Sequence, residues 1–535
     1  MVPLTVRTAS GLVQGAPSDL ADGVTVFKGM PYAASTAGEN RWRPPQPPEP
    51  WNGLYKATVF GPMCPQTRDG SVHGSEDCLN LNIWTPSESL DENLPVYVWI
   101  HGGRFTFGSG CDRLHDGSGL AQKGIIVVTF NYRCGILDLS EESNHHSSGN
   151  FGFLDQVAAL KWVQENIGAF GGDRTRVTIG GQSAGAASVG LHMMSPLSRG
   201  LFKACISQSG QRIPRDPLIV CLSPAYRVKE AAESHGIAVL KEKGVTTVAA
   251  LRKQPLDLVL LGSDRADTCW GNPPLYRPCL DGWVIPFTYE ESLKRGLPSD
   301  VPILTGHNAD EGGTYDDPDF SLDDFQSCAL QKYGPFTDRF LSLYSPSGSI
   351  NARDAWNEAC RDCSRVTIAC WAKEYHRHSK SSVFGYHYAH EIFPRHGPSE
   401  LSTPQQVTGA KASAPKPRVH DLNSLRSTYT YSKPRRGLPR GAFHGSELPF
   451  VFNSADSVDG FAFGEVDEQV TDIMMTYWSN FIKKGTPNGG SVAEFPDIRR
   501  GEIMYLTAWP FPMTFTKTLE KMVFWEEYLQ SQKSW

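Results

Sequence analysis

A serine flanked by glycines is the residue of this sequence with the clearest capacity for covalent chemistry. It lies in Gly181-Gln182-Ser183-Ala184-Gly185, where the glycines two positions before and after the serine relieve backbone crowding in a sharp turn. A hydroxyl held on such a turn is exposed for attack on an acyl carbon. The pattern by itself is weak, because about one match is expected by chance in every two or three chains of this length.

The residues around Ser183 predict the strand and the helix that this turn requires. Residues 176–180 form a β-branched run typical of a buried strand, and the small residues of 184–194 predict a helix. A helix starting here adds free N–H groups and the positive end of its dipole. The match is also the only one in the chain. Ser183 is therefore predicted to be a nucleophile.

A second glycine pair follows another predicted strand, residues 96–100. The run His101-Gly102-Gly103-Arg104 lets backbone N–H groups turn toward a substrate oxygen, as an oxyanion hole requires. The serine turn predicts such a loop, with a further donor from Ala184, the residue after the nucleophile. An ordinary turn at the end of a strand is the alternative.

A serine nucleophile needs a base, and the base needs an acid to orient it. In enzymes with a serine turn of this kind, the acid comes after the serine in the sequence and the histidine comes after the acid. Asp310 and Glu311 come after the predicted strand 301–305, and position alone leaves both open. His444 lies between glycines in a later loop, but the chain has 15 histidines, and a structural histidine is the commoner case.

The elements that must position these residues indicate an α/β fold. Residues 96–100, 124–130, 176–180 and 301–305 are apolar runs typical of strands covered on both faces, and residues 154–167 have helical spacing. Strands alternating with helices predict a parallel sheet flanked by helices. We expect a single catalytic domain over residues 1–535. A polar, Pro-rich segment at about 395–440 is predicted to be a disordered surface insertion rather than a lid.

Composition excludes several classes of protein. The 535-residue chain is 40% hydrophobic and has a net charge of -6, which disfavours nucleic-acid and anionic-membrane binders. No apolar run is long enough to span a membrane. The N-terminus shows no signal peptide and the chain has no Asn-x-Ser/Thr acceptor, so a cytoplasmic location is favoured. Cys360 and Cys363 are a weak zinc signal and are taken as ordinary thiols.

Many ordered motifs resemble one family, the type-B carboxylesterases and lipases. The resemblance covers nearly the whole chain except the insertion. Besides the Ser183 and His101 runs, the matching segments are Phe27-Lys28-Gly29-Met30-Pro31-Tyr32, Arg41-Trp42-Arg43-Pro44-Pro45, Ser75-Glu76-Asp77-Cys78-Leu79-Asn80-Leu81-Asn82, Asn131-Tyr132-Arg133, Asp155-Gln156, residues 162–167, Phe170-Gly171-Gly172-Asp173, Ser207-Gln208-Ser209-Gly210 and Gly485-Thr486-Pro487-Asn488.

The resemblance implies an α/β-hydrolase fold with no metal and no cofactor. It implies Glu311 as the acid and His444 as the base. It also implies oxyanion donors at the N–H groups of Gly103, Arg104 and Ala184, with Gly102 shaping the turn. A disulfide between Cys64 and Cys78 is implied as well, and that bond keeps a secreted location open.

Departures from the family pattern narrow the expected substrate. Arg104 stands where the family usually has a third glycine; a positive φ there would cost an arginine about 1–2 kcal/mol. Its side chain is either structural or a partner for a substrate carboxylate. Gln182 is neutral, whereas cholinesterases carry Glu, and loop 64–78 has no Trp and is shorter than a lipase lid.

The expected function is therefore hydrolysis of short- to medium-chain or specialised small-molecule esters through an acyl-enzyme. A transferase or lactone-forming enzyme on the same triad is one alternative, and a non-catalytic interaction protein of the same fold is another.

Overall fold

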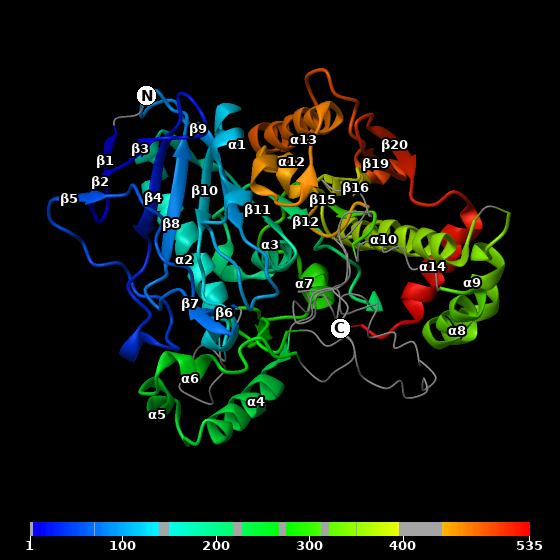
Figure 1. The fold of residues 1–535 in the computed structure, drawn as a ribbon, viewed down its shortest axis with the longest axis horizontal. Coiled ribbons are helices and arrows are strands. Elements are labelled where there is room, and N and C mark those ends of the chain that lie inside the picture. The colour runs from blue at the N-terminus through cyan, green and yellow to red at the C-terminus, as the bar shows by residue number, and fades with distance from the viewer. Residues whose placement is uncertain are drawn as a thin grey trace, which may run out of the picture.

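The structure is a computed structural model that describes residues 4–68, 70–138, 149–217, 227–266, 274–311, 320–348, 350–394 and 441–534. Its centre is an 11-stranded sheet (Figure 1) in the order β20-β19-β16-β15-β12-β11-β9-β10-β8-β4-β3. In chain order the strands of this sheet are β3 (Ala16–Pro17), β4 (Thr25–Pro31), β8 (Asn80–Thr85), β9 (Leu94–Ile100), β10 (Ile126–Phe130), β11 (Gly172–Gln182), β12 (Ala204–Gln208), β15 (Ile303–Asn308), β16 (Val383–Tyr388), β19 (Glu502–Leu506) and β20 (Phe511–Thr514).

The middle of this sheet is parallel and its edges are antiparallel. Strands β10, β9, β11, β12, β15, β16 and β19 pair in parallel along the sheet. Strands β8, β4 and β3 at one edge and β20 at the other pair in antiparallel fashion. Val96 to Ile100 of β9 have no exposed surface, as expected of a strand covered on both faces. The predicted α/β class and mostly parallel sheet are confirmed.

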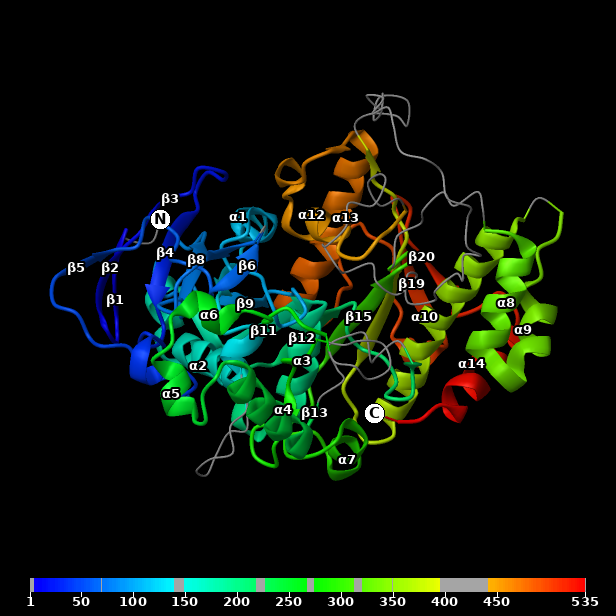
Figure 2. The same ribbon diagram turned by 60° about the horizontal axis from the view of Figure 1, so that its bottom comes forward.

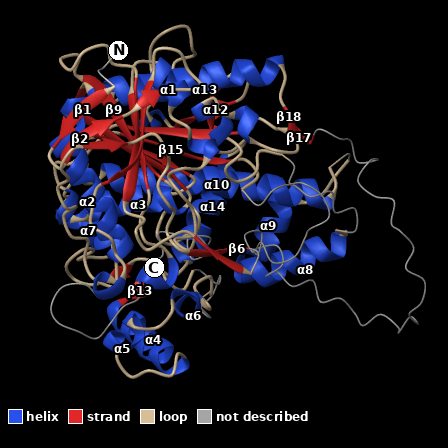
Figure 3. Ribbon diagram, turned by 60° about the vertical axis from the view of Figure 1, so that its left-hand side comes forward, coloured by secondary structure: helices blue, strands red, loops and turns tan. Residues whose placement is uncertain are grey.

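Helices cover both faces of the sheet because successive strand residues point to opposite sides. Val98 of β9 packs into one core and Trp99 into the other. Figure 2 shows α12 and α13 above the sheet with α2 and α3 below it, and Figure 3 shows the twisted fan of strands between them. The first core contains residues of α2 (Phe151–Asn166), α3 (Ala184–Met194), α10 (Ala352–His376) and α14 (Leu519–Ser531); the second contains residues of α1 (Ser118–Gln122), α12 (Leu448–Phe452) and α13 (Glu465–Lys484).

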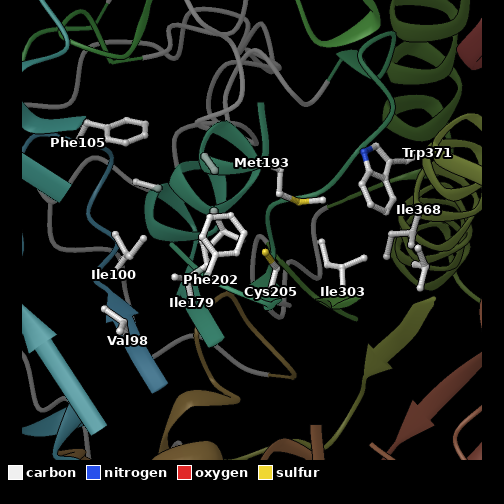
Figure 4. Close-up of a cluster of buried hydrophobic side chains, with 14 of the residues drawn as sticks. Val98, Ile100, Phe105, Ile179, Met193, Phe202, Cys205, Ile303, Ile368 and Trp371 are labelled. Atoms are coloured by element: carbon white, nitrogen blue, oxygen red, sulfur yellow. The ribbon is translucent and has the colours of Figure 1, made fainter. Parts of the chain in front are cut away.

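The first core forms a packed base beneath the serine turn. Figure 4 shows Ile100 of β9, Ile179 of β11 and Met193 of α3 within this cluster. Each is at most 2% exposed, and burying such a side chain contributes about 1.5–3 kcal/mol. The ends of β9 and β11 and helix α3 therefore pack in one hydrophobic core.

Shorter elements surround the sheet. Among the described residues, no helix is long and apolar enough to cross a membrane. The remaining strands are β1 (Thr5–Thr8), β2 (Gly11–Gln14), β5 (Leu54–Lys56), β6 (Gln66–Arg68), β7 (Ser71–His73), β13 (Arg227–Val228), β14 (Cys279–Leu280), β17 (Phe393–Pro394) and β18 (Phe461–Ala462), and the remaining helices are α4 (Lys229–Glu242), α5 (Val248–Arg252), α6 (Leu256–Leu260), α7 (Tyr289–Arg295), α8 (Leu322–Tyr333) and α9 (Thr337–Tyr344).

The predicted and observed boundaries of β15 differ at both ends. The predicted strand 301–305 begins two residues too early and ends three residues too early, because Gly306 to Asn308 continue the ladder against Tyr386 to Tyr388 of β16. Gly306 is a strand residue, and a Cβ on it would lie 2.4 Å from the Tyr386 ring. The predicted insertion at about 395–440 lies outside the described residues, and the single catalytic domain stays a prediction.

Candidate active site

Ser183 is placed at the sharp turn between β11 and α3, as the sequence predicted. Its backbone has φ 58° and ψ −120°, a sparsely populated conformation, which costs about 1–3 kcal/mol. The Ser183 N–H donates to the carbonyl of Gln208 on β12 at 2.9 Å, and its carbonyl accepts from the Ala187 N–H at 2.9 Å. The neighbouring strand and the helix together hold the strained residue in place.

The flanking glycines are required by close backbone contacts. A Cβ on Gly181 would lie 2.4 Å from the carbonyl carbon of Gly185, and a Cβ on Gly185 would lie 2.0 Å from the Ile100 carbonyl oxygen. Both distances are shorter than any side chain tolerates, so the first turn of α3 can pack against the end of β9 only without side chains. The glycine spacing that signalled the turn in the sequence thus has a steric cause.

The glycine pair after β9 lies beside the serine turn. A Cβ on Gly102 would lie 2.7 Å from the Gln182 carbonyl oxygen and 3.3 Å from Ser183 Cβ. Gly103 has φ 106°, and Arg104 and Phe105 have φ 56° and 58°. Arg104 thus has the positive φ whose energetic cost to an arginine was anticipated from the sequence. In the part of the chain that the structure describes, the N–H groups of Gly103 and Ala184 have no acceptor, which suits donors for a substrate oxygen.

Replacing Gly103 by alanine is expected to lower kcat/KM for ester hydrolysis by about 10²–10³-fold, the usual effect of losing an oxyanion donor. A Cβ on Gly103 would lie 2.1 Å from the Phe107 carbonyl oxygen, and the φ of 106° is unfavourable for alanine, so the loop must move. Steady-state kinetics of Gly103→Ala measure the effect. Gly168→Ala is the control, since its Cβ would meet nothing within 4 Å; equal activity of the two variants would contradict the role of this loop.

His444 and Glu311 are brought together although 133 residues separate them in the chain. His444 Nδ1 donates a short hydrogen bond to Glu311 Oε2, and the side chains are 9% and 23% exposed. The other oxygen of the carboxylate, Oε1, accepts from the Asn308 N–H at 2.9 Å. Both oxygens of Glu311 are thus occupied in an arrangement that fixes the imidazole.

The charge of Glu311 is set by opposing effects. Burial alone would raise its pKa, but the attraction and the hydrogen bond of His444, with smaller effects of His307 and Arg212, lower the pKa from 4.5 to about 2. Glu311 is therefore ionised at neutral pH and can only accept hydrogen bonds.

Asp310, the other carboxylate that the sequence left open, points to a different partner. Its Oδ1 accepts from Arg361 Nη2 at 2.6 Å, and its Oδ2 accepts from the Ala442 N–H at 3.1 Å. The Asp310 N–H in turn donates to the Ala442 carbonyl at 2.9 Å. Asp310 therefore fastens the loop that carries His444 to the end of β15, while its neighbour Glu311 contacts the imidazole.

Two polar residues near His444 were not identified from the sequence. Asn308 Nδ2 donates to the Phe443 carbonyl at 2.7 Å and to Glu447 Oε2 at 2.6 Å. Glu447 is fully buried and also accepts from Gln208 Nε2 at 3.0 Å; burial raises its pKa, opposed by the bond from Asn308. The spacing of Glu447 three residues after His444 is the only signal the sequence offered.

The two cysteines of the expected disulfide lie side by side in the structure. Cys64 and Cys78 are fully buried, and their side chains hydrogen-bond each other. A third buried residue, Cys134, donates its N–H to Cys64 Sγ at 3.3 Å. The structure holds no bond between the pair, so the Cys64–Cys78 disulfide stays a prediction. Among the described residues, no group of three or more His, Cys, Asp or Glu side chains could hold a metal ion.

Comparisons with known proteins agree with this geometry. The model of the carboxylesterase family matches residues 2–525. Fumonisin B1 esterase of Sphingopyxis macrogoltabida is 33% identical over 532 residues, covering 94% of this chain and 86% of the relative. Para-nitrobenzyl esterase of Bacillus subtilis is 31% identical over 512 residues, covering 91% of each chain.

Solved structures show the same fold. A PNB esterase superposes with a TM-score of 0.73 at 28% identity, over 98% of this chain and 99% of that one. The carboxylesterase EST55 of Geobacillus stearothermophilus gives the same TM-score of 0.73 at 28% identity, over 98% and 100% of the two chains. The chain therefore belongs to the carboxylesterase family, and it is a carboxylic ester hydrolase with the α/β-hydrolase fold.

Proposed function

We propose that this enzyme hydrolyses small-molecule carboxylic esters through an acyl-enzyme on Ser183, with His444 as general base and Glu311 as its orienting acid. The observation that carries the proposal is the pairing of His444 with Glu311 beside a serine held at φ 58°. A strained serine and a histidine oriented by an ionised carboxylate are the parts that acyl transfer needs.

The proposed reaction has two steps. His444 Nε2 takes the Ser183 proton while Oγ attacks the ester carbonyl, and the N–H groups of Gly103, Arg104 and Ala184 stabilise the oxyanion. His444 then gives the proton to the leaving alcohol. Water, deprotonated by His444, attacks the acyl-enzyme. The bond between Ser183 Oγ and the acyl carbon breaks, the acid leaves, and His444 returns the proton to Oγ. Glu311 stays ionised throughout and stabilises the imidazolium.

We further propose a preference for short- to medium-chain or specialised small-molecule esters. Loop 64–78 is short and contains no Trp, so it supplies neither a lipase-like lid nor an aromatic site for choline. Arg104 at φ 56° replaces a glycine beside the serine, which leaves less room for bulky tertiary-alcohol esters. Two of the relatives are named for fumonisin B1 and for para-nitrobenzyl esters.

A panel of p-nitrophenyl esters from acetate to palmitate tests this preference. We expect kcat/KM for acetate and butyrate to exceed the value for palmitate by at least about tenfold, because a pocket rejects chains that it cannot enclose. A maximum at palmitate would contradict the proposed preference and indicate a lipase. Adding an alcohol acceptor to the same assay separates hydrolysis from acyl transfer, which would appear as a new ester product.

A further inference from the structure

The side chain of Gln182 lies against the nitrogen atom that must act as the base. Gln182 is the last residue of β11, is 7% exposed, and its Nε2 lies 2.9 Å from His444 Nε2. A Cβ on Gly102 would lie 3.3 Å from Gln182 Oε1, and one on Gly445 would lie 3.7 Å from its Nε2. The carboxamide is thus enclosed between the glycine loop after β9 and the loop that carries His444.

The direction of this hydrogen bond follows from the groups on the other side of the ring. Glu311 is ionised, so His444 Nδ1 must carry the proton that joins them. In the neutral imidazole, Nε2 then has a lone pair and no proton. Only a donor can pair with it, which places the NH₂ group of Gln182, and not its oxygen, toward the ring.

The Ser183 hydroxyl does not donate a hydrogen bond to the lone pair of His444 Nε2 in this structure. In the described parts of the chain, Ser183 Oγ makes no hydrogen bond to His444, whose Nε2 is bonded to Gln182 instead. Nucleophile–base contacts are often long before substrate binds and tighten later. A Cβ on Gly102 would lie 3.3 Å from Gln182 Oε1 and 3.3 Å from Ser183 Cβ, so the two side chains lie on the same side of the turn.

We propose that Gln182 is a positioning residue that donates to His444 Nε2 in the resting enzyme, keeps this nitrogen unprotonated, and releases it to the Ser183 hydroxyl. The inference rests on the proposed function of His444 as the base. A carboxylate at position 182 could only accept, and would favour the protonated ring at every stage.

Two carboxylates near His444 favour its protonated form, and Gln182 is a neutral partner beside them. Glu311, from the turn after β15, contacts Nδ1. Glu447, at the start of α12, is buried and interacts electrostatically with both Glu311 and His444. Both carboxylates favour a proton on the ring, whereas the NH₂ group of Gln182 opposes one at Nε2. Gln182 is the one side chain of this set that favours the base form.

The acid limb of kcat/KM tests the role of Gln182. We expect the pH at which kcat/KM falls on the acid side to be lower in the wild type than in either Gln182 variant. It should move up by about half a unit to one unit in Gln182→Met, the value of one net hydrogen bond. In Gln182→Glu it should move up by about 1–3 units, the effect of an adjacent opposite charge. Gln122→Glu, an exposed change on α1 with the same charge difference, should leave the limb in place.

A titration of His444 itself gives a readout that needs no turnover. In protein labelled with ¹³C at histidine Cε1, the His444 resonance is identified by its loss in His444→Gln. Its titration midpoint should follow the same order as the acid limbs, wild type below Gln182→Met below Gln182→Glu. Equal titration midpoints in the wild type and Gln182→Met would overturn the proposal. This holds even if Gln182→Met and Gln182→Glu lose activity through a structural effect.

The two measurements separate the two hypotheses. If the wild type hydrolyses no ester, the proposed function fails, while the titration still decides whether Gln182 acts on the ring. If the wild type is active and the limbs of wild type and Gln182→Met coincide, the proposal for Gln182 fails and the esterase mechanism stands. Thermal melting of each variant shows that the titrated protein is folded.

Discussion

Ser183→Ala is expected to lower kcat for p-nitrophenyl butyrate by about 10⁴–10⁶-fold, with little change in thermal stability. The Ser183 hydroxyl is the only side chain in the proposed mechanism that bonds to the acyl carbon, and loss of a triad nucleophile in serine hydrolases has effects of this size. Alanine also lacks the Oγ but keeps the Cβ, so the turn at φ 58° is preserved. Steady-state kinetics and a melting curve measure both quantities.

Ser188→Ala provides the matched control for this change. Ser188 lies on the same helix and its Oγ donates to the Ala184 carbonyl at 3.1 Å, so the variant loses a structural hydroxyl near the site without losing the nucleophile. A fluorophosphonate should label the wild type and Ser188→Ala but not Ser183→Ala. Full labelling of Ser183→Ala would show that another residue is the nucleophile.

Glu311→Gln is expected to lower kcat/KM by about 10³–10⁴-fold. The amide cannot stabilise the imidazolium that forms when His444 takes the serine proton, and its NH₂ group favours the wrong tautomer of the ring. The low pKa of about 2 for Glu311 means that the acid stays charged over the whole range in which the enzyme is assayed. The loss should therefore be present at every pH from about 5 to about 9.

The adjacent carboxylate is the control that the sequence itself offers. Asp310→Asn keeps the backbone bond from the Asp310 N–H to the Ala442 carbonyl. Its single carboxamide oxygen cannot accept from both Arg361 and the Ala442 N–H, so one of these two side-chain bonds is lost. We expect it to retain activity within about tenfold and to melt at a lower temperature, because the His444 loop is held less firmly. The opposite result, with Glu311→Gln active and Asp310→Asn inactive, would exchange the assignments of the two acids.

Local sequence determined the elements that present the nucleophile. The turn at Ser183 was predictable because its requirements are short-range: a strand, a glycine where Gly181 faces Gly185, and a helix that starts at Ala184. The apolar runs of β9 and β10 likewise specify strands buried on both faces, which is why the parallel centre of the sheet could be inferred from sequence.

The tertiary structure decided which polar groups meet. Asp310 and Glu311 are adjacent and both follow β15, and position could not separate them; the fold turns Glu311 to His444 and Asp310 to Arg361. The end of β15 was also misplaced, since Gly306 is held in the strand by pairing with Tyr386 rather than by its own preference.

The contact of Gln182 with His444 is the clearest case of information that sequence alone could not contain. The two residues are 262 positions apart, and no local pattern relates them. The chain by itself determined the turn, the strands and the identity of each side chain, because these depend on neighbours within a few residues. Which nitrogen receives which hydrogen bond depended on how distant loops pack at one edge of the sheet, and only the folded structure determines that.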